Sequence, residues 1–449
     1  MKSFPFLFFF ILIAFQINAQ DESVRTDTLK KEKIKKGWNF GALPIVGYDS
    51  DQGFQYGALA NIYYYGDGSA YPQYFHSFYF EVSRFTKGGG INQFFFDSKK
   101  LIPGIRVTTD VSYLTEKALN FYGFNGYQSS YHTGWENQGD TSYRTRMFYH
   151  HERKLFRIGA DFQGKLAGRW LNWFAGLAFL KFETGPVDTA KFNQGKSQDE
   201  KLPDVATLYD DYVSWGVLKE KEKNGGTNNI IKVGVVFDTR DNEPCPMQGI
   251  WTEALVGLAP GFLGDGKFSF AKLSVIHRQY FTLVKNDLSI GYRLAYQGTI
   301  AGKAPFYFQT YMLNTFSQST TIDGLGGSET LRGILRNRVV GDGVAFGNIE
   351  MRWKFWHFRF IRQNFYASAS AFTDAGMVVQ KINIDKSGIP AEINTDEYFS
   401  SASEYPHVSA GAGLHLAMNQ NFILTMEYGR AMDKRDGKDG FYVGLGYLF

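Results

Sequence analysis

The chain has 449 residues, of which 17% are aromatic and 49 are glycine, and its formal net charge is +4. So small a net charge on so long a chain excludes a protein that binds nucleic acid through a strongly basic surface. The mean hydropathy of -0.27 is low for a helical membrane protein. It is ordinary for a membrane barrel, in which half of each strand faces a polar lumen, and abundant glycine and aromatic residues favour such a sheet.

Residues 1–19 have the layout of a secretory signal peptide, with an apolar run from Phe4 to Phe15 and a predicted cleavage site before Gln20. An N-terminal membrane anchor is the alternative. The apolar run is, however, shorter than the ~20 residues that a helix needs to cross a bilayer. Residues 20–37 are rich in lysine and are predicted to form a charged periplasmic tether.

From Trp38 to Phe449 the sequence is a series of short segments in which apolar and polar residues alternate. In one of them Val107 and Val111 alternate with Arg106 and Asp110, so the charged residues share one face. Charge on one face only indicates a lumen. The predicted strands are 38–46, 54–65, 74–85, 91–101, 104–114, 143–166, 171–182, 229–240, 249–259, 267–281, 288–297, 344–355, 364–374, 406–417, 421–430 and 440–449.

The predicted connections differ in length according to their order. The four longest, 115–142, 183–228, 298–343 and 375–405, follow the fifth, seventh, eleventh and thirteenth strands. In an up-and-down barrel all odd-numbered connections lie on one side, and outer-membrane barrels have long loops outside and short turns in the periplasm. The sequence therefore predicts an all-β fold: a transmembrane antiparallel β-barrel of about 16 strands over residues 38–449.

The last predicted strand, 440–449, has an aromatic face. That face would carry Phe441, Val443, Leu445, Tyr447 and Phe449. Gly444 and Gly446 lie on the other face and weaken the strand, because glycine packs poorly and loses much entropy on ordering. We expect this strand to be recognised during assembly and then to pair weakly with the first strand, closing the barrel.

Five motifs follow one another in the second half of the chain. They are Phe237-Asp238-Thr239-Arg240-Asp241-Asn242 with Gly249, Leu331-Arg332-Gly333-Ile334, Asn348-Ile349-Glu350-Met351-Arg352, Phe372-Thr373-Asp374-Ala375-Gly376 and the terminal Phe449. In this order and spacing they resemble the signature series of the outer-membrane insertase superfamily, also called the BamA/TamA-like or bacterial surface antigen family. The resemblance covers roughly residues 229–449.

The resemblance implies that the long loop after the eleventh strand folds into the lumen. There Arg332 would pair with Glu350 and Asp374, and Gly333 would permit a tight backbone. The physics agrees, because a guanidinium fork suits two carboxylates and an inward charge without a partner is costly. An exposed loop arginine without a fixed partner is the alternative. If the luminal lock exists, Arg332→Ala should lower heat resistance or abundance more than Arg336→Ala.

Two other groups of residues invite a chemical interpretation. Asp238, Arg240, Asp241, Asn242 and Gly249 are interpreted as a structural turn, because such residues form turns and adjacent carboxylates on a strand point to opposite faces. The run His150-His151-Glu152 lacks a third ligand nearby and is interpreted as a polar part of a strand. No catalytic, cofactor-binding or metal-binding residue is predicted, and we expect a protein that is not an enzyme.

The resemblance implies a role in inserting, assembling or translocating proteins at the outer membrane of a Gram-negative bacterium. Family members carry periplasmic modules before the barrel, and residues 20–37 are too few to form one. The expected partners are therefore the lipid bilayer, client outer-membrane proteins and a separate periplasmic protein. A passive channel or a structural surface protein is the alternative function, and a barrel enzyme ranks last because no nucleophile motif is present.

Overall fold

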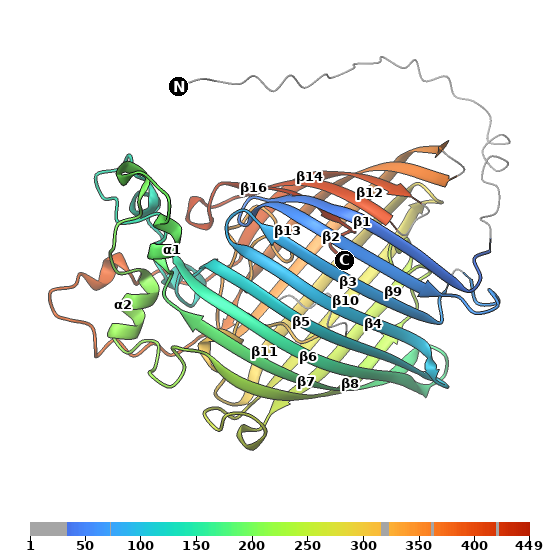
Figure 1. Ribbon diagram of the computed structural model, residues 1–449, viewed down its shortest axis with the longest axis horizontal. Coiled ribbons are helices and arrows are strands. Elements are labelled where there is room, and N and C mark those ends of the chain that lie inside the picture. Colours follow the sequence, from blue (N-terminus) through green and yellow to red (C-terminus); the bar gives the residue numbers. More distant parts are fainter. Residues whose placement is uncertain (1–33, 72, 316–322, 361–362, 419–421) are drawn as a thin grey trace, which may run out of the picture. The chain divides into compact units, whose positions relative to one another are not determined.

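The computed structural model describes residues 34–71, 73–315, 323–360, 363–418 and 422–449. They form a closed barrel of sixteen antiparallel strands, each paired with its neighbours in the sequence (Figure 1). The strands are β1 (Trp38–Asp49), β2 (Gly53–Tyr64), β3 (His76–Phe85), β4 (Gly89–Ile102), β5 (Ile105–Asn120), β6 (His150–Ala167), β7 (Leu171–Gly185), β8 (Gly226–Asp238), β9 (Gly249–Ala259), β10 (Phe270–Val284), β11 (Leu288–Gly302), β12 (Gly343–Phe360), β13 (Gln363–Gln380), β14 (His407–Met418), β15 (Phe422–Ala431) and β16 (Asp439–Leu445). The predicted fold and strand number are confirmed. The predicted signal peptide lies outside the described residues.

Alternation along each strand separates a lipid-facing surface from a polar interior. On β5, Val111 and Tyr113 are 39% and 43% exposed, whereas Asp110 and Ser112 are buried inside. On β12, Met351 is exposed and Glu350 is completely buried. Because successive side chains of a strand point to opposite faces, a single sequence pattern supplies both the apolar outer surface and the polar lumen.

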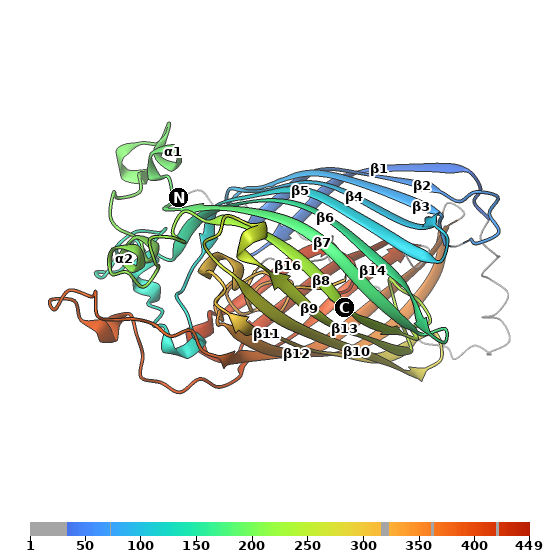
Figure 2. The same ribbon diagram turned by 90° about the horizontal axis from the view of Figure 1, so that it is seen from below.

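The long connections lie at one end of the barrel, which we call the long-loop end (Figures 1 and 2). Their described residues are 121–149, 186–225, 303–315, 323–342 and 381–406. The helices are α1 (Thr189–Asn193) and α2 (Leu208–Ser214), with 3-10 turns η2 (Gly126–Gln128), η3 (Thr133–Glu136), η4 (Gln198–Glu200), η5 (Gly261–Leu263), η6 (Phe306–Phe308), η8 (Thr395–Glu397) and η9 (Lys434–Asp436). Among the described residues, no helix has the length and apolar character needed to cross a membrane. The opposite end, where the turns are short, is the short-turn end.

The long loops pack against one another around an aromatic core. Tyr149, Tyr212 and Phe308 are fully buried in it, and Phe121 makes edge contacts with Tyr212 at 5.6 Å between ring centroids. This core joins all four long connections. The four long connections therefore pack together into one structure with its own aromatic core, which we call the cap, at the long-loop end.

Several predicted strand boundaries differ from those of the structure, among them the start of the sixth strand and the end of the eighth. β6 begins at His150 and not at Tyr143, since the backbone amides of Arg144 and Thr145 both donate to the Trp135 carbonyl in the cap. β8 ends at Asp238, so Arg240 lies in the following turn.

The predicted last strand is also too long. β16 ends at Leu445, and Gly446 adopts a φ of +87°, a left-handed conformation that glycine adopts without strain. Tyr447 and Phe449 therefore leave the outer face. Phe449 is 6% exposed and packs against Tyr280 of β10 inside the barrel.

Candidate functional site

The loop between β11 and β12 turns into the lumen. An antiparallel bridge between Leu325 and Val339 holds its two arms together, and Leu331 and Ile334 are buried against the wall of the barrel. The arginine between those two residues thus lies at the inner tip of a packed hairpin. The packing of Leu331 and Ile334 therefore fixes the position of the Arg332 side chain, which a flexible loop would leave undefined.

Arg332 is fully buried and contacts three carboxylates. Its Nε and Nη2 donate to the two oxygens of Asp374 on β13, at 2.9 and 3.0 Å. Its Nη1 donates to Glu350 Oε2 on β12 at 2.7 Å and to Glu427 Oε1 on β15 at 2.6 Å. The ring of Phe372 lies 3.4 Å from the guanidinium carbon. All three nitrogens of the guanidinium therefore donate to carboxylates on β12, β13 and β15, which holds the loop against three strands.

A second arginine extends this cluster. Arg352 Nε donates to the other oxygen of Glu350 at 2.7 Å, and its Nη2 donates to the Phe449 carbonyl at 2.7 Å. Glu350, His415 and Glu427 are close enough together to hold a metal ion. Arg332 already donates to both carboxylates of that group, so the guanidinium supplies the positive charge that the group requires.

Gly333 brings the loop backbone into contact with β15. Its φ is +88°, and a Cβ atom there would lie 2.5 Å from the Arg430 nitrogen. Gly429 on β15 faces it, and a Cβ at that position would meet the Arg332 carbonyl at 2.6 Å. The Gly333 amide donates to the Tyr442 hydroxyl of β16 at 2.9 Å. Two glycines thus let two backbones touch.

We expect Gly333→Ala to loosen the loop without removing any charge. The methyl group would collide with the β15 backbone at a residue that already has positive φ, and overpacking of this kind costs about 1–3 kcal/mol. The measurement is the temperature at which the folded, fast-migrating band disappears on unheated gels. Gly444→Ala is the control, since a Cβ at Gly444 would meet nothing within 4 Å. Equal midpoints for the two variants would contradict the close contact.

Sequence reasoning missed three members of the site. Glu427 is the third carboxylate on Arg332, and Arg336 and Arg338 fix other parts of the loop. Arg336 donates to Glu116 of β5 at 2.7 Å and to Asp323 at 2.6 Å. Arg336→Ala, expected from the sequence to be the milder substitution, therefore also breaks a buried ion pair. The alternation of residues along β15 could have indicated that Glu427 faces the lumen, because it places Glu427 on the same face as Thr425.

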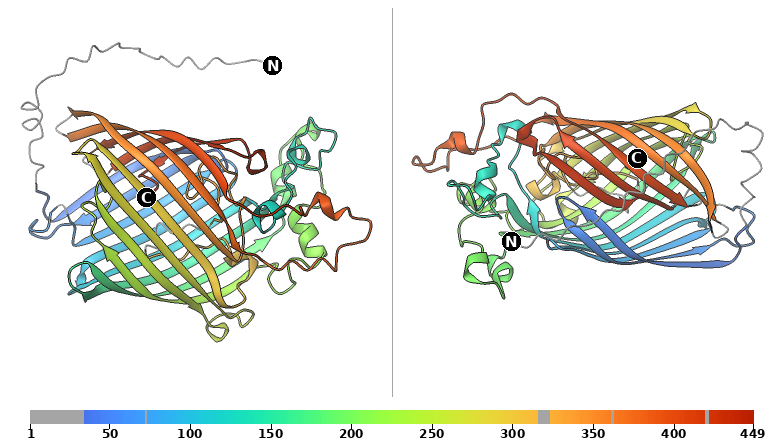
Figure 3. Two further views of the ribbon diagram at one scale, coloured as in Figure 1. Left: turned by 180° about the vertical axis from the view of Figure 1, so that it is seen from behind. Right: turned by 90° about the horizontal axis from the view of Figure 1, so that it is seen from above.

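The seam between β1 and β16 is short. Tyr48 pairs with Val443 and Asp49 with Tyr442, and the Ser50 amide donates to the Phe441 carbonyl at 3.1 Å. By contrast β1 pairs with β2 along its whole length. Between the described residues of β1 and β16 no further pairing occurs, so residues 38–47 present a free strand edge towards the short-turn end. Figure 3 shows these first and last strands, blue and red, next to each other.

The luminal loop contacts both sides of this seam. Ser328 Oγ donates to Asp49 Oδ2 at 2.8 Å on the β1 side. On the β16 side the Leu335 amide donates to the Asp436 carbonyl at 2.9 Å, in addition to the contact between Gly333 and Tyr442. The loop is thus attached to β16 and its hairpin more extensively than to β1.

The predicted C-terminal signal residues fall into two groups. Phe441 is 42% exposed on the outer face, and Gly444 lies in the same strand beside open space. Tyr447 and Phe449 lie inside, where the Tyr447 hydroxyl is 2.8 Å from Ser368 Oγ. Because the chain turns inward after Leu445, these aromatic residues lie away from β1. Among the described residues, those of β1 before Tyr48 therefore have no partner on β16.

The turn motif after β8 is built from local hydrogen bonds. Arg240 donates through Nε and Nη2 to both oxygens of Asp238, at 3.0 and 2.9 Å. Asp241 Oδ1 accepts the amides of Met247 and Gln248, and Asn242 Oδ1 accepts that of Cys245. Gly249 has a φ of +105°, and a Cβ there would lie 2.8 Å from the Arg240 Cα. These residues shape the turn.

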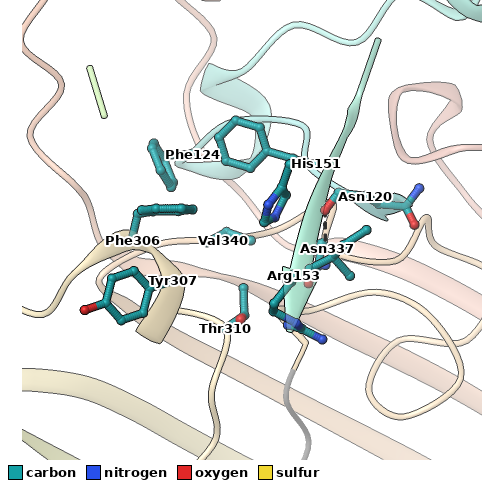
Figure 4. Close-up of a pocket in the computed structure, with 11 residues that line it drawn as sticks. Asn120, Phe124, His151, Arg153, Phe306, Tyr307, Thr310, Asn337 and Val340 are labelled. Atoms are coloured by element: carbon teal, nitrogen blue, oxygen red, sulfur yellow. Dashed lines mark hydrogen bonds between the residues drawn. The ribbon is translucent and has the colours of Figure 1, made fainter. Parts of the chain in front are cut away.

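A cavity of about 20 Å³ lies between the cap and the luminal loop (Figure 4). His151, Arg153, Asn337 and Phe306 point towards it, and Asn337 Nδ2 donates to the Asn120 carbonyl at 3.1 Å. Such a volume holds about one water molecule. The cavity has no room for a substrate.

The fold and this site define a class: a sixteen-stranded membrane barrel with an arginine-tipped loop held inside and a short seam between its first and last strands. A family model described as the Omp85 superfamily domain matches residues 106–449. The chain belongs to the Omp85 superfamily of outer-membrane barrels.

The solved structures with a similar fold include BamA and CdiB. BamA from Haemophilus ducreyi lacking POTRA domains 1-3 is 14% identical with a TM-score of 0.51, and the match covers 92% of this chain and 71% of that one. CdiB from Escherichia coli is 10% identical with a TM-score of 0.52, and the match covers 94% of this chain and 64% of that one. The chain thus spans less than two thirds of CdiB. No sequence among the curated proteins matches the chain.

Proposed function

We propose that this barrel assists the insertion, assembly or translocation of proteins at the outer membrane of a Gram-negative bacterium. Membership of the Omp85 superfamily supports the proposal, as does the likeness in fold to BamA and CdiB. The predicted signal peptide, residues 1–19, would be removed on export. The luminal lock of Arg332, Gly333, Glu350 and Asp374 would keep the loop in place during this work.

The observation that carries the proposal is the free edge of β1. Residues 38–47 pair with β2 on one side and, within the part of the chain that the structure describes, have no strand partner on the other. An unpaired backbone group in the hydrocarbon layer costs several kcal/mol, estimated at roughly 2–7 kcal/mol from transfer data. An extended segment of a client could pair with this edge and satisfy those groups, which is β-strand addition.

The contents of the lumen argue against a passive channel. The cap closes the long-loop end with a packed aromatic core, and the loop that carries Arg332 fills the space below it. An open pore would need a continuous polar path through both. Purified protein in planar bilayers should accordingly give small, fluctuating conductance, and a large steady conductance would favour the channel.

Depletion of the protein in its host tests the proposed function. Quantitative mass spectrometry of isolated outer membranes should show that other barrel proteins decline before growth stops. Outer-membrane lipoproteins, which need no barrel assembly, are the internal control. If the levels of every other barrel stay constant while this protein disappears, the proposal is wrong. Separately, affinity capture of the protein from detergent-solubilised membranes would identify the periplasmic partner that we expect at the short-turn end.

A further inference from the structure

The turn between β8 and β9 reaches across the short-turn end. Its two arms extend the hairpin beyond the strand ends: the Thr239 amide donates to the Ile250 carbonyl at 2.8 Å and the Asp241 amide to the Gln248 carbonyl at 3.2 Å. The tip is closed by the side chains of Asp241 and Asn242, as described above. We call residues 241–248 the crossbar. It has a defined shape, so its contacts are not those of a loose loop.

On one side the crossbar contacts β4 and β5 through Glu243. The Glu243 carboxylate lies 3.2 Å from Arg106 of β5 and 3.9 Å from Lys99 of β4. Asp97 holds Arg106 in place at 2.6 Å. Desolvation raises the pKa of Glu243, but the charges of Arg106, Lys99 and Arg240 outweigh it and lower this pKa to about 2. The carboxylate is therefore ionised throughout the physiological pH range.

On the other side the crossbar contacts β12 and β13. The Tyr366 hydroxyl of β13 donates to Cys245 Sγ at 3.3 Å, and Lys354 Nζ of β12 donates to Met247 Sδ at 3.4 Å. Cys245 and Tyr366 are 5% and 4% exposed, and Tyr447 packs against the same cluster. The thiol of the crossbar and the tyrosine of the wall are thus buried in one cluster with Ala417 and Ile423, which attaches the crossbar to β13.

These two sets of contacts belong to opposite parts of the ring. β4 and β12 are eight positions apart in a barrel of sixteen strands, as are β5 and β13. The crossbar starts midway between them, from β8 and β9. One short hairpin tip therefore joins three separate parts of the wall. On β13 the next residue on the luminal face above Tyr366 is Ser368, which lies deeper in the barrel and is 1% exposed.

We propose that the crossbar is a gate that closes the lumen at the short-turn end. The cap and the loop carrying Arg332 close the other end, so the interior is sealed from both sides of the membrane. A chain passing lengthwise through the barrel would have to displace both closures, whereas one pairing with the free edge of β1 would displace neither. The gate rests on the contacts of Glu243, Cys245 and Met247 and does not depend on the proposed function.

Cys245 is the only cysteine of the chain, so its labelling reports directly on the crossbar. In the full-length protein in nanodiscs, a charged maleimide should label wild-type Cys245 slowly. Glu243→Ala should speed labelling at least tenfold, because it releases the tip from Arg106 and Lys99. The matched control is Glu397→Ala, since Glu397 is equally exposed, at 45% against 43%, and pairs with Arg144 at 3.4 Å in the cap. Rapid labelling of wild-type Cys245 would overturn the gate.

A second experiment measures access to the lumen itself. Ser368→Cys is introduced with Cys245→Ser, and residues 242–247 are either kept or replaced by Asn-Gly. A bulky maleimide should label position 368 at least tenfold faster in the shortened protein than in the intact one. Equal rates in the two proteins, whether fast or slow, would overturn the gate. If the shortened protein does not fold, the Glu243→Ala variant serves in its place.

Discussion

Arg332→Ala should destabilise the barrel more than any other single substitution of a charged residue in the luminal loop. It removes the guanidinium that pairs with Asp374 and Glu427 and leaves Glu350 with Arg352 alone, in a site where all three carboxylates are buried. Removing one partner of a buried ion pair typically costs about 3–5 kcal/mol, because the remaining charge is buried without compensation. The temperature at which the folded band disappears on unheated gels should fall, and the amount of protein in the membrane should fall with it.

Arg435→Ala is the matched control for this substitution. Arg435 also pairs with a carboxylate, Asp433 at 2.6 Å, but its side chain is 42% exposed. Exposed pairs contribute about 0–1 kcal/mol, so this variant should behave like the wild type. Arg332→Lys should recover only part of the loss, since an ammonium group cannot donate to Asp374 through two parallel bonds. Equal melting of the Arg332→Ala and Arg435→Ala proteins would show that the luminal pairs contribute nothing.

A disulfide across the seam should abolish the proposed activity. With Cys245→Ser, the pair Tyr48→Cys and Val443→Cys links β1 to β16 at one of the two residue pairs that join them. Directly opposed residues in antiparallel strands bring their Cβ atoms within about 4.5–5.5 Å, close to disulfide geometry. In cells whose only copy of the protein carries this cysteine pair, formation of the disulfide should lower the levels of the other outer-membrane barrels, as depletion does. A reductant should restore those levels.

The control for the disulfide shares one of its cysteines. Met426→Cys with Val443→Cys links β15 to β16, which are paired neighbours away from the seam. This disulfide should form equally well and leave the levels of other barrels unchanged. If the seam disulfide forms completely and those levels do not change, clients do not use the seam and the route through the free edge of β1 is wrong.

The barrel could be predicted from the sequence because its strands repeat a local rule. Alternation on β5 and β12 needs only neighbouring residues, and so does the inward placement of Glu350. The pairing of Arg332 with Asp374 and Glu350 was expected from the resemblance to a family. Its third partner, Glu427, is 95 residues away in the sequence, and no local pattern connects the two.

Other features depended on contacts that a local pattern cannot encode. The period of two continues through Tyr447 to Phe449, yet Arg352 and Tyr280 draw these residues into the lumen. Residues 143–149 were predicted to begin the sixth strand, yet Phe148 and Tyr149 pack in the cap. The turn residues Asp241 and Asn242 indicated a turn, whereas the reach of Glu243 to Arg106 depends on where β5 lies in the ring.

The position of the charged cluster in the sequence constrains the order in which the molecule assembles. Arg332, Glu350, Asp374 and Glu427 all lie between β11 and β16, so they can meet on a curved, still open sheet. Inside a finished cylinder the same arginine would have to cross a sealed cap to reach its partners. We therefore expect the loop to dock while the wall is assembling, and the junction of Tyr48 with Val443 to form last.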